Sequence, residues 1–438
     1  MNRLVLGLLR GDEGKGKITD YFSKTADVVV RYAGSCNAGH TIYRGDEKIV
    51  LHQIPSGILH KKECIIGRGC LIDLKKLLKE IEQLNDLIKN GKLKGFKKDD
   101  SIFDYLKISY GAHIIFQHHI KEDIKREDSG KGNGSTKCGI APGYRDKYYR
   151  SGMRVFDLVK MIHDEKKVNS PEFKDLLKDI DLTTFELQTI LTCAVDDEYY
   201  INEVYPEDVN FLFEGAQGVL LDINSPYYPN VSSSSVGVDG VIAGTGIDYN
   251  KLLKYNEFKI IGIAKAYMSS VGVGQFLTQL DGVNDKSAKL IRDAGNEYGA
   301  TTGRPRKVGW FDIPLLRYSL RTSGTNELCL TRLDTLMEAF KDVGEFKVCI
   351  AYKNKETNEK IYDADIWNLD KYEPVYVTFK IWKECSFTDK NFMKFLKAVQ
   401  LLIPIQIKYI SVGKNEDDIL IMTDDWVKDE IKEIKLFK

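Results

Sequence analysis

No part of the sequence is an apolar segment long enough to cross a membrane as a helix. The first apolar run, Leu4–Leu9, is short and is followed at once by Arg10. No later stretch reaches the roughly 18 apolar residues that a spanning helix needs. The chain also lacks a net charge, because 64 Lys and Arg residues balance 64 Asp and Glu residues. This balance excludes a strongly basic nucleic-acid coat or a polyacidic tail as the main feature.

Proline is scarce, with 10 residues in 438, whereas glycine is frequent, with 36. The composition is therefore neither that of Pro-rich disorder nor that of collagen, and it is typical of a folded globular protein. No small-residue cleavage site follows the first apolar run, so we expect no signal peptide and a cytoplasmic location. The length allows up to three domains at roughly 150 residues each. Because the chain has no internal repeat and no low-complexity linker, we expect one domain over residues 1–438.

Cysteine patterns for a disulfide framework or a zinc site are also absent. The eight cysteines lie far apart and form no C-x-x-C pair, which predicts reduced cytosolic thiols in a chain of this length. The adjacent histidines His118 and His119, with Glu122, could be drawn as a metal cluster. No further ligand lies nearby in the sequence, so we interpret these histidines as an exposed helix face.

Short, continuous apolar runs alternate with amphipathic helical patterns along the chain. This alternation predicts an α/β fold: one large domain with a mostly parallel central sheet flanked by helices, similar to the P-loop NTPases. In such sheets, ligands bind at the carboxyl ends of the strands. The predicted strands are Leu4–Leu9, Asp27–Tyr32, Phe211–Phe213, Ile260–Ala264, Leu328–Thr331, Lys347–Ala351 and Ile407–Val412. The predicted helices include Leu74–Ile88, Arg154–His163 and Asn391–Leu402.

A glycine-rich loop follows the first predicted strand. Residues 11–17 read GDEGKGK and open a helix that we expect to begin near Ile18. The glycines allow backbone amides to turn inward, and the N-terminal end of the following helix favours bound phosphate. The spacing fits G-x-x-x-x-G-K, but Ile18 stands where the ordinary P-loop has a hydroxyl for magnesium. Asp12, inside the loop, is the candidate to hold the metal instead.

The GDEGKGK loop resembles the signature of the adenylosuccinate synthetase family, and further motifs match in the same order along nearly the whole chain. The family joins the 6-oxo carbon of inosine monophosphate (IMP) to the amine of aspartate and consumes GTP. The resemblance therefore implies a ligase of purine nucleotide biosynthesis that forms adenylosuccinate through 6-phosphoryl-IMP. The matching segments are VVRYAGSCNAGHT (29–41), LHQIPSGIL (51–59), GSTKCGIAPGYRDKYYR (134–150), FEGAQGVLLDI (213–223), GNEYGATTGRPRKVGW (295–310) and TRLD (331–334).

The resemblance assigns the chemistry to the glycine loop and to the segment N-A-G-H-T. Removing the N1 proton of IMP places charge on O6, which can then attack the γ-phosphorus of GTP. The reaction thus needs a base, a cation and a proton donor. Asp12 is implied as the base, His40 as the acid beside the β–γ bridge, and Gln217 as a hydrogen-bonding group around O6. Asp12 and the Gly39 carbonyl are implied as ligands of Mg²⁺, a cation that prefers oxygen.

The resemblance also implies a set of GTP-binding residues. Lys15 and Lys17 would supply positive charge to the phosphates. Asp334 would accept hydrogen bonds from the paired donors of guanine, which adenine lacks. Ser411 and Gly413 match the family's loop beneath the base. The full set is Gly11, Glu13, Gly14, Lys15, Gly16, Lys17, Thr41, Arg332, Asp334, Ser411 and Gly413.

Two further sets are implied for IMP and for aspartate. The IMP set combines amides, hydroxyls and guanidinium groups: Asn37, Thr136, Arg150, Gln217, Ser232 and Arg304. The aspartate set lies in one loop whose arginines suit a dicarboxylate: Thr301, Thr302, Arg304 and Arg306. Arg150 corresponds to the arginine that the family sends across a dimer interface. The resemblance thus implies a homodimer in which each protomer completes its partner's site.

Several positions depart from the family pattern around both substrates. Leu9-Arg10 replaces Gln-Trp before the glycine loop, and Cys36 ends an altered segment before N-A-G-H-T. Cys138 stands where an arginine is expected, and Lys414 replaces a proline. The residues of the chemical core are intact. The activity is therefore a firmer prediction than the exact substrate preference.

Two other functions stay open. One is a related synthetase that acts on deoxyguanylate with an ATP-type donor, as in phage routes to 2-aminoadenine. That branch typically lacks the aspartate of the glycine loop, so Asp12 and also Asp334 argue against it. The other is a GTP-binding switch or regulatory protein without catalysis. A switch would not need Gln217, residues 301–306 and Arg150 in addition to a phosphate loop.

Overall fold

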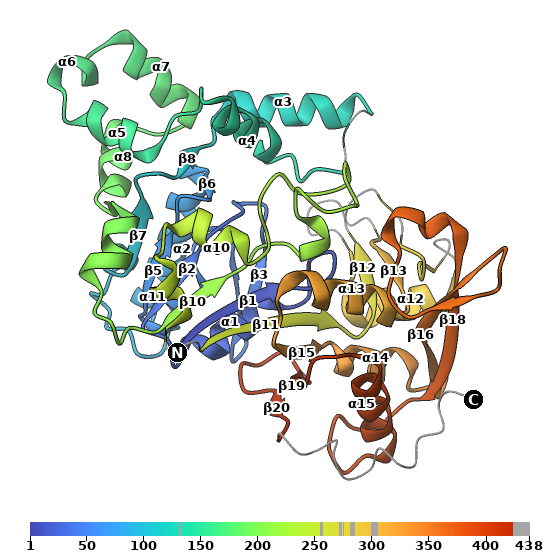
Figure 1. Cartoon of the computed structure of the whole chain (residues 1–438). Coiled ribbons are helices and arrows are strands. Elements are labelled where there is room, and N and C mark those ends of the chain that lie inside the picture. The colour runs from blue at the N-terminus through green and yellow to red at the C-terminus, as the bar shows by residue number, and fades with distance from the viewer. Residues whose placement is uncertain are drawn as a thin grey trace.

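The computed structural model describes residues 1–130, 132, 134–254, 257–270, 274, 276–280, 285–298 and 305–423. Within these residues, ten strands form a central sheet (Figure 1). All neighbouring strands in it are parallel except for one pair at the edge of the sheet, β19 (Ile407–Ser411) and β20 (Ile419–Ile421), which is antiparallel. From β20 and β19 the order continues with β15 (Glu327–Thr331), β11 (Phe258–Lys265), β1 (Asn2–Gly7), β10 (Phe211–Glu214), β2 (Val28–Arg31), β5 (Glu63–Ile66), β7 (Leu106–Ser109) and β9 (Ala194–Val195).

Helices flank this sheet, as the sequence predicts, and the α/β fold is confirmed. The predicted helices correspond to α2, α5 and α15. The described α-helices are α1 (Lys15–Ser23), α2 (Leu74–Lys89), α3 (Gln117–Asp128), α4 (Ile140–Tyr149), α5 (Val155–Ile162), α6 (Glu165–Val168), α7 (Pro171–Ile180), α8 (Thr184–Leu191), α9 (Asp197–Tyr199), α10 (Asp239–Thr245), α11 (Tyr249–Leu253), α12 (Lys286–Gly295), α13 (Ile313–Ser323), α14 (Leu333–Phe340) and α15 (Lys390–Leu402). In Figure 1, α5 to α8 project at the upper left, whereas β16, β18 and α15 lie on the right.

The remaining described strands form smaller sheets. The two-stranded sheets are β12 (Met268–Ser270) with β13 (Lys307–Gly309), β3 (His40–Arg44) with β4 (Glu47–Leu51), and β6 (Leu71–Ile72) with β8 (His113–Ile114). The fourth small sheet contains β14 (Phe311–Asp312), β16 (Glu345–Asn354), β17 (Lys360–Ile361) and β18 (Tyr372–Lys380).

One predicted strand belongs to a different sheet from the one expected. Lys347–Ala351 lies in β16, which pairs in parallel with β14 and in antiparallel fashion with β17 and β18, and not in the central sheet. The prediction was wrong on this point because an apolar run indicates burial, which is common to both sheets, and does not identify the neighbouring strand.

The central sheet is buried on both faces. On β1, Leu4 and Leu6 pack in one large apolar cluster, and Val5, whose side chain points to the opposite face, packs in a second cluster. All three side chains have no exposed area. This burial explains why the strand is a continuous apolar run and not an alternating one. One sheet shared by both clusters supports a single domain, which stays a prediction.

The strand order determines where ligands can bind. β1 lies between β10 and β11, and β2 lies beyond β10. Because these strands are parallel, the segments that follow β1, β2 and β10 emerge at one edge of the sheet, where ligands bind in such folds. These segments hold the glycine loop, N-A-G-H-T and G-A-Q-G. Among the described residues, no helix combines the length and apolarity needed to cross a membrane.

Candidate active site

The loop between β1 and α1 turns through a series of left-handed residues. Gly11, Asp12 and Gly14 have φ angles of 87°, 60° and 90°. Gly14 is the N-cap, and α1 begins at Lys15, which is earlier than the start near Ile18 that the sequence predicts. The unpaired N–H groups of the first helical turn therefore lie directly at the end of the loop, where they favour a phosphate group.

Glu13 supports this loop from beneath. Its carboxylate is fully buried and accepts hydrogen bonds from the backbone N–H groups of Gly11 (2.7 Å) and Leu9 (3.2 Å) and from Lys15 Nζ (2.6 Å). A Cβ at Gly7 would lie 2.3 Å from a Glu13 carboxylate oxygen, so a side chain there would displace it. The Glu13 side chain thus stabilises the loop, and its backbone N–H is left for the predicted contact with GTP.

His40 is the first residue of β3 and packs against the first turn of α1. A Cβ at Gly16 would lie 2.7 Å from the His40 Cβ, so glycine is needed for this approach. The imidazole is buried, and its Nδ1 pairs with the carboxylate of Glu214 at the end of β10. Glu214 also accepts hydrogen bonds from the backbone N–H (2.6 Å) and the hydroxyl (3.0 Å) of Ser56. The ring is therefore oriented through Nδ1, which leaves Nε2 for a ligand.

Burial and charge act in opposite directions on this pair. Burial lowers the pKa of His40, although the charge and the hydrogen bond of Glu214 oppose the shift. Burial alone would raise the pKa of Glu214, but the charge and hydrogen bond of His40, with the charge of Arg31, keep it below its ordinary value. Glu214 is thus an ionised carboxylate that can stabilise a protonated His40. Sequence analysis missed Glu214; the signal was a carboxylate at the end of an apolar strand.

Asp12 and Arg306 connect the glycine loop to the predicted aspartate loop. Arg306 Nη1 lies 2.6 Å from the Asp12 carboxylate and 3.0 Å from that of Glu297. Glu297 is buried and accepts further hydrogen bonds from Lys265 Nζ (2.8 Å) and the Tyr267 hydroxyl (2.8 Å). Burial alone would raise the pKa of Glu297, but these cations and hydrogen bonds lower it to about 2. Sequence analysis did not identify Glu297 or Lys265, which together fix Arg306.

Only part of the predicted aspartate set has a described position. Thr301, Thr302 and Arg304 lie outside the described residues. Arg306 is therefore the residue of this set whose contacts with Asp12 and Glu297 the structure describes.

Asn37 and Gln217 present unpaired polar atoms at the same edge of the sheet. Asn37 Oδ1 and Gln217 Oε1 are buried and have no hydrogen-bond partner within the described part of the chain. A Cβ at Gly34 would lie 3.4 Å from the Gln217 amide oxygen, so the segments after β2 and β10 touch here. Because an unpaired buried oxygen is costly, both atoms indicate a ligand that donates hydrogen bonds.

The other predicted IMP residues are less enclosed. Thr136 is exposed in the segment between α3 and α4, and the hydroxyl of Ser232 lies 3.1 Å from that of Ser234. Arg150 is exposed at the C-terminal end of α4, with a φ of 68°. In the part of the chain that the structure describes, its side chain makes no hydrogen bond or ion pair. Its predicted role at the partner's monophosphate site stays a prediction.

Lys17 fastens α1 to the loop that follows β19. Its ammonium group donates hydrogen bonds to the Ser411 hydroxyl (2.8 Å), the Gly413 carbonyl (2.8 Å) and the Asp418 carbonyl (2.9 Å). Burial lowers the pKa of Lys17 to about 8, and the charges of Asp418 and Asp334 oppose the shift. These contacts differ from the expectation that Lys17 faces the phosphates. Its three donors are directed at the predicted base-binding loop.

The remaining predicted GTP residues lie close by in the chain. Thr41 follows His40 on β3 and is exposed. Arg332 has a φ of 65° and is the N-cap of α14, and Asp334 lies in the first turn of that helix. α14 directly follows β15, and β15 pairs with β19, so Asp334 and the loop that begins at Ser411 both follow the carboxyl ends of adjacent strands.

The family model of adenylosuccinate synthetase matches residues 4–420 of the chain. The chain belongs to the adenylosuccinate synthetase family. Its relatives include the adenylosuccinate synthetases of Thermodesulfovibrio yellowstonii, 38% identical over 440 residues (95% of this chain and 98% of that protein), and of Brevibacillus brevis, 39% identical over 443 residues (96% and 98%). The resemblance in the sequence motifs is thereby confirmed.

Two solved structures extend this comparison. The fully ligated adenylosuccinate synthetase of Plasmodium falciparum is 32% identical, with a TM-score of 0.82 over 96% of this chain and 100% of that one. The succinoaminodeoxyadenylate synthetase of cyanophage S-2L, bound to dGMP and dATP, is 18% identical, with a TM-score of 0.61 over 96% and 94%. At that identity the phage protein shows a shared fold alone.

Adenylosuccinate synthetases use a metal ion, and the predicted ligands suit a hard cation. The Asp12 side chain is 40% exposed, and a Cβ added at Gly39 would meet no atom within 4 Å, so both positions are open. A carboxylate and a backbone carbonyl are oxygen donors of the kind that Mg²⁺ prefers. In this structure Asp12 pairs with Arg306, so a cation at Asp12 competes with that arginine.

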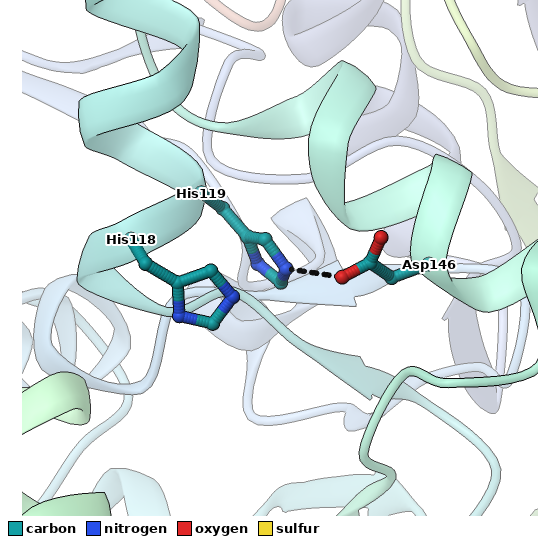
Figure 2. Close-up of side chains that lie close together, drawn as sticks. All are labelled: His118, His119 and Asp146. Carbon is teal, nitrogen blue, oxygen red and sulfur yellow. Dashed lines mark hydrogen bonds and ion pairs between the residues drawn. The ribbon is translucent and has the colours of Figure 1, made fainter.

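The paired histidines of α3 do not form the exposed face that the sequence predicted, and Figure 2 shows that His119 points toward Asp146. His118 is exposed and pairs with Asp179, but His119 is buried and lies 3.1 Å from Asp146 on α4. The ligand atoms of His118, His119 and Asp146 lie within 4.8 Å of one another. His119 Nδ1 accepts a hydrogen bond from the backbone N–H of Phe116 (3.2 Å), so Nε2 donates to Asp146. With both nitrogens engaged, His119 fastens α3 to α4.

A second group, Asp20, His60 and Glu416, also has its ligand atoms within 4.8 Å. The guanidinium of Arg44 lies among them, 2.5 Å from Asp20 and 3.1 Å from Glu416. This arginine neutralises the carboxylates that a metal would need. The cluster therefore connects α1, β3 and the loop after β19 without an ion.

Proposed function

We propose that the chain joins IMP to L-aspartate at the expense of GTP and forms adenylosuccinate, as its family name indicates. The contact between Asp12 and Arg306 carries the proposal. It brings a carboxylate of the phosphate-binding loop to a guanidinium of the loop predicted to bind a dicarboxylate. Phosphoryl transfer and the binding of an amino acid can then take place in the same site. A GTP switch or a simple NTPase would not need a binding loop for a dicarboxylate beside its phosphate loop.

The proposed reaction has two steps. Asp12 accepts the N1 proton of IMP, the electron pair moves to O6, and O6 attacks the γ-phosphorus while the bond to the β–γ bridging oxygen breaks. This step yields GDP and 6-phosphoryl-IMP. The neutral amine of aspartate then attacks C6 and gives up one proton, while the C6–O6 bond breaks and its electron pair leaves with the phosphate.

His40 and Gln217 assist the first step. His40 Nε2 faces the leaving bridge oxygen and donates to it, and Glu214 stabilises the protonated ring through Nδ1. Gln217 hydrogen-bonds around O6. We propose Mg²⁺ as the cation, held by Asp12 and the Gly39 carbonyl, where it would offset the negative charge on the phosphates.

The other predicted residues are proposed to bind substrates. Asp334, with Ser411 and Gly413, would select guanine, and Lys17 would hold that loop in place. Arg306 and the loop before it would bind aspartate. The proposed phosphate and ribose contacts of GTP and IMP are Gly11, Glu13, Gly14, Lys15, Gly16, Thr41, Arg332, Asn37, Thr136, Arg150, Ser232 and Arg304.

Arg150 leads us to propose a homodimer. Its side chain is exposed, and the adjacent Tyr148 and Tyr149 are 66% and 79% exposed. Large exposed aromatic side chains beside an arginine are typical of a protein interface. In such a dimer Arg150 would reach the monophosphate bound to the partner. We also propose a cytoplasmic location and a single domain for the protein.

The alternative of a deoxyguanylate synthetase is less well supported. The phage structure shares the fold, but the sequence holds Asp12, the proposed base, and Asp334, the proposed guanine acceptor, which favour IMP as the substrate and GTP as the donor. A regulatory protein without catalysis would not require the connected Glu214–His40 and Arg306–Asp12 pairs.

A product assay tests these proposals directly. IMP and deoxyguanylate are each supplied with aspartate and Mg²⁺, once with GTP and once with ATP. We expect adenylosuccinate from IMP and GTP, with a preference of about 100-fold or more in kcat/KM over the other combinations. A higher kcat/KM for deoxyguanylate with ATP would overturn the assignment, and GTP binding without product in any mixture would support a regulatory protein.

A further inference from the structure

We propose that Cys36 and Cys138 form an oxidation-sensitive thiol pair, which a peroxide converts reversibly to a disulfide beside the monophosphate site. The two thiols lie far apart in the sequence, but both contact the ammonium group of the same lysine, Lys76. Both belong to a small apolar cluster between the segment after β2 and the segment before α4.

A lysine lies against both sulfur atoms. Lys76 Nζ is 3.6 Å from Cys36 Sγ and 3.7 Å from Cys138 Sγ. Its position is fixed by Asp73, which pairs with Nζ at 3.0 Å and caps α2 by accepting the Lys76 backbone N–H. A fixed ammonium group favours the thiolate form of a neighbouring cysteine. The site is therefore a pair of thiols with a cation in place.

The two cysteines have different roles. Cys36 is 6% exposed, whereas Cys138 is partly exposed, so an oxidant reaches Cys138 first. The hydrogen bond from Cys36 lowers the pKa of Cys138 to about 6, with help from Thr136 and Lys76 and against the effect of burial. The same hydrogen bond and burial raise the pKa of Cys36. Cys138 is thus the attacking thiolate and Cys36 the protonated thiol that resolves the product.

The oxidation balances with one peroxide. The Cys138 thiolate attacks one oxygen of hydrogen peroxide, the O–O bond breaks, and the released hydroxide takes a proton to form water. The Cys36 sulfur then loses its proton and attacks the Cys138 sulfenic sulfur, whose hydroxide leaves as a second water. The two thiols lose two electrons, and the peroxide gains them. A dithiol reductant reverses the reaction by thiol–disulfide exchange.

The remaining cysteines lack this environment. All eight cysteines of the chain are described, and burial raises the pKa of each of the other six. Five of them are buried, so oxidants reach them poorly. The sixth, Cys385, is partly exposed, but its pKa is raised to about 12. Oxidation at neutral pH is therefore selective for the Cys36–Cys138 pair.

The disulfide would alter the neighbouring segments. Cys36 adjoins Asn37, and Cys138 lies two residues after Thr136. An S–S bond of about 2.05 Å requires the sulfurs to approach well inside hydrogen-bonding distance, so both segments move toward each other. We expect a several-fold higher KM for IMP in the oxidised protein. This consequence, unlike the disulfide itself, rests on the proposed function of Asn37 and Thr136.

Peptide mapping of the unaltered, full-length protein tests the disulfide without any assay of activity. The protein is treated with hydrogen peroxide at neutral pH, digested without reduction and analysed by mass spectrometry. We expect a crosslink between the peptides that contain Cys36 and Cys138, and its loss after dithiothreitol. Oxidation without this crosslink, or with equal modification of Cys385, overturns the proposal.

Variants separate the roles of the two thiols. Cys36→Ser should leave a Cys138 sulfenic acid that dimedone traps, and Cys138→Ser should abolish peroxide consumption at this site. Lys76→Met should slow alkylation of Cys138 several-fold at neutral pH, and Cys385→Ser is the matched control that should leave the crosslink unchanged. Peroxide consumption that persists in Cys138→Ser counts against the assignment. If the crosslink forms and the KM for IMP stays constant, the link to the monophosphate site is wrong and the thiol pair remains.

Discussion

Glu214 illustrates how a single buried carboxylate can prepare a catalytic group. Both of its oxygens are engaged, one by His40 and Ser56 and the other by the Ser56 backbone. A carboxylate held in this way can fix the orientation of the imidazole, and its negative charge favours the protonated form of the ring. Its contribution is therefore expected in the turnover number and in its dependence on pH, more than in substrate affinity.

We expect Glu214→Gln to lower kcat about 10- to 100-fold. Since His40 must be protonated to act as an acid, activity falls as the pH rises through the pKa of His40. Removal of the negative charge of Glu214 lowers that pKa, so the basic limb of the kcat profile should move to lower pH. Steady-state kinetics across the pH range measures both effects. Ser56→Ala is the control, because it removes one hydrogen bond and leaves the charge; an unmoved basic limb in Glu214→Gln would contradict the role.

Asp12→Asn should abolish adenylosuccinate formation while nucleotide binding stays detectable. The amide cannot accept the N1 proton, but the backbone of the phosphate loop is unchanged. Product formation and the binding of a fluorescent GTP analogue are the two measurements. Turnover near that of the unaltered protein would show that another group is the base.

At this scale, motifs identify residues but not the direction of their side chains. Asp12 and Glu13 are neighbours in one motif, yet the Asp12 side chain is partly exposed and that of Glu13 is buried beneath the loop. Glu214 and Glu297 lie within matching segments, but the motifs do not mark them, because their partners His40 and Lys265 come from other strands. Only the folded chain shows these pairs.

Among the elements, α1 has a second function besides its N-terminal phosphate site. Through Lys17 it holds the loop after β19, and through Lys24 it reaches Asp417 of the same loop at 2.7 Å. The loop proposed to lie beneath guanine is thus attached to the helix proposed to bind its phosphates. One helix would then position both ends of GTP.

Lys17→Met should raise the KM for GTP about tenfold, because three hydrogen bonds from an ammonium group to this loop are lost. The KM for aspartate should change little. Lys24→Met is the matched control: it contacts the same loop, but Lys24 is about a third exposed and its ion pairs are weak. Equal effects of the two substitutions on GTP would show that Lys17 does not hold the base site.

The elements themselves were partly predictable. Short, continuous apolar runs predicted β1, β2, β10, β11, β15 and β19 of the central sheet, because strands buried on both faces have a distinctive composition. The outer strands β7 and β9 are short, and β7 alternates as LKIS, so no run marked them. The antiparallel β20 and the small sheet around β16 depend on which strands pair and in which direction, and composition does not encode this.

Across the whole molecule, acid stability should depend on Glu297. Its pKa is about 2 in the folded chain and near 4.5 when unfolded, so its stabilising effect is complete above pH 4.5 and is lost as the pH falls to about 2. The size is on the order of 3 kcal/mol. Glu297→Gln should lower the free energy of unfolding at pH 7. Below pH 4.5, the free energy of unfolding of this variant should fall less steeply with pH than that of the unaltered protein.

Denaturant unfolding at a series of pH values measures this effect. Glu359→Gln, which changes an exposed carboxylate in the turn between β16 and β17, is the control and should leave the free energy of unfolding nearly unchanged. If Glu297→Gln keeps the full acid slope of the unaltered protein, another carboxylate is responsible for it.

The proposed dimer is tested by mixing two inactive variants. Arg150→Leu lacks the residue given to the partner, and Asp12→Asn lacks the base of its own site. In a random mixture half of the dimers contain one of each, and one of the two sites in such a dimer is intact, so about a quarter of the activity should return. Arg145→Leu, on the same helix, should by itself remain active. No recovery in a verified mixed dimer would contradict a shared site.

The Asp12–Arg306 ion pair couples two ligands that need not touch each other. A cation that takes Asp12 leaves Arg306 without its exposed counter-ion, and a dicarboxylate that takes Arg306 leaves Asp12 free for a cation. Each ligand thus removes the cost of breaking the ion pair for the other ligand. By thermodynamic linkage, the cation increases the affinity for the dicarboxylate by the same factor as the dicarboxylate increases the affinity for the cation. Calorimetry should therefore show tighter binding of aspartate with Mg²⁺ and GTP than with GTP alone. Asp12 and Arg306 neutralise each other in this structure, and separating them makes both charges available to the ligands at once.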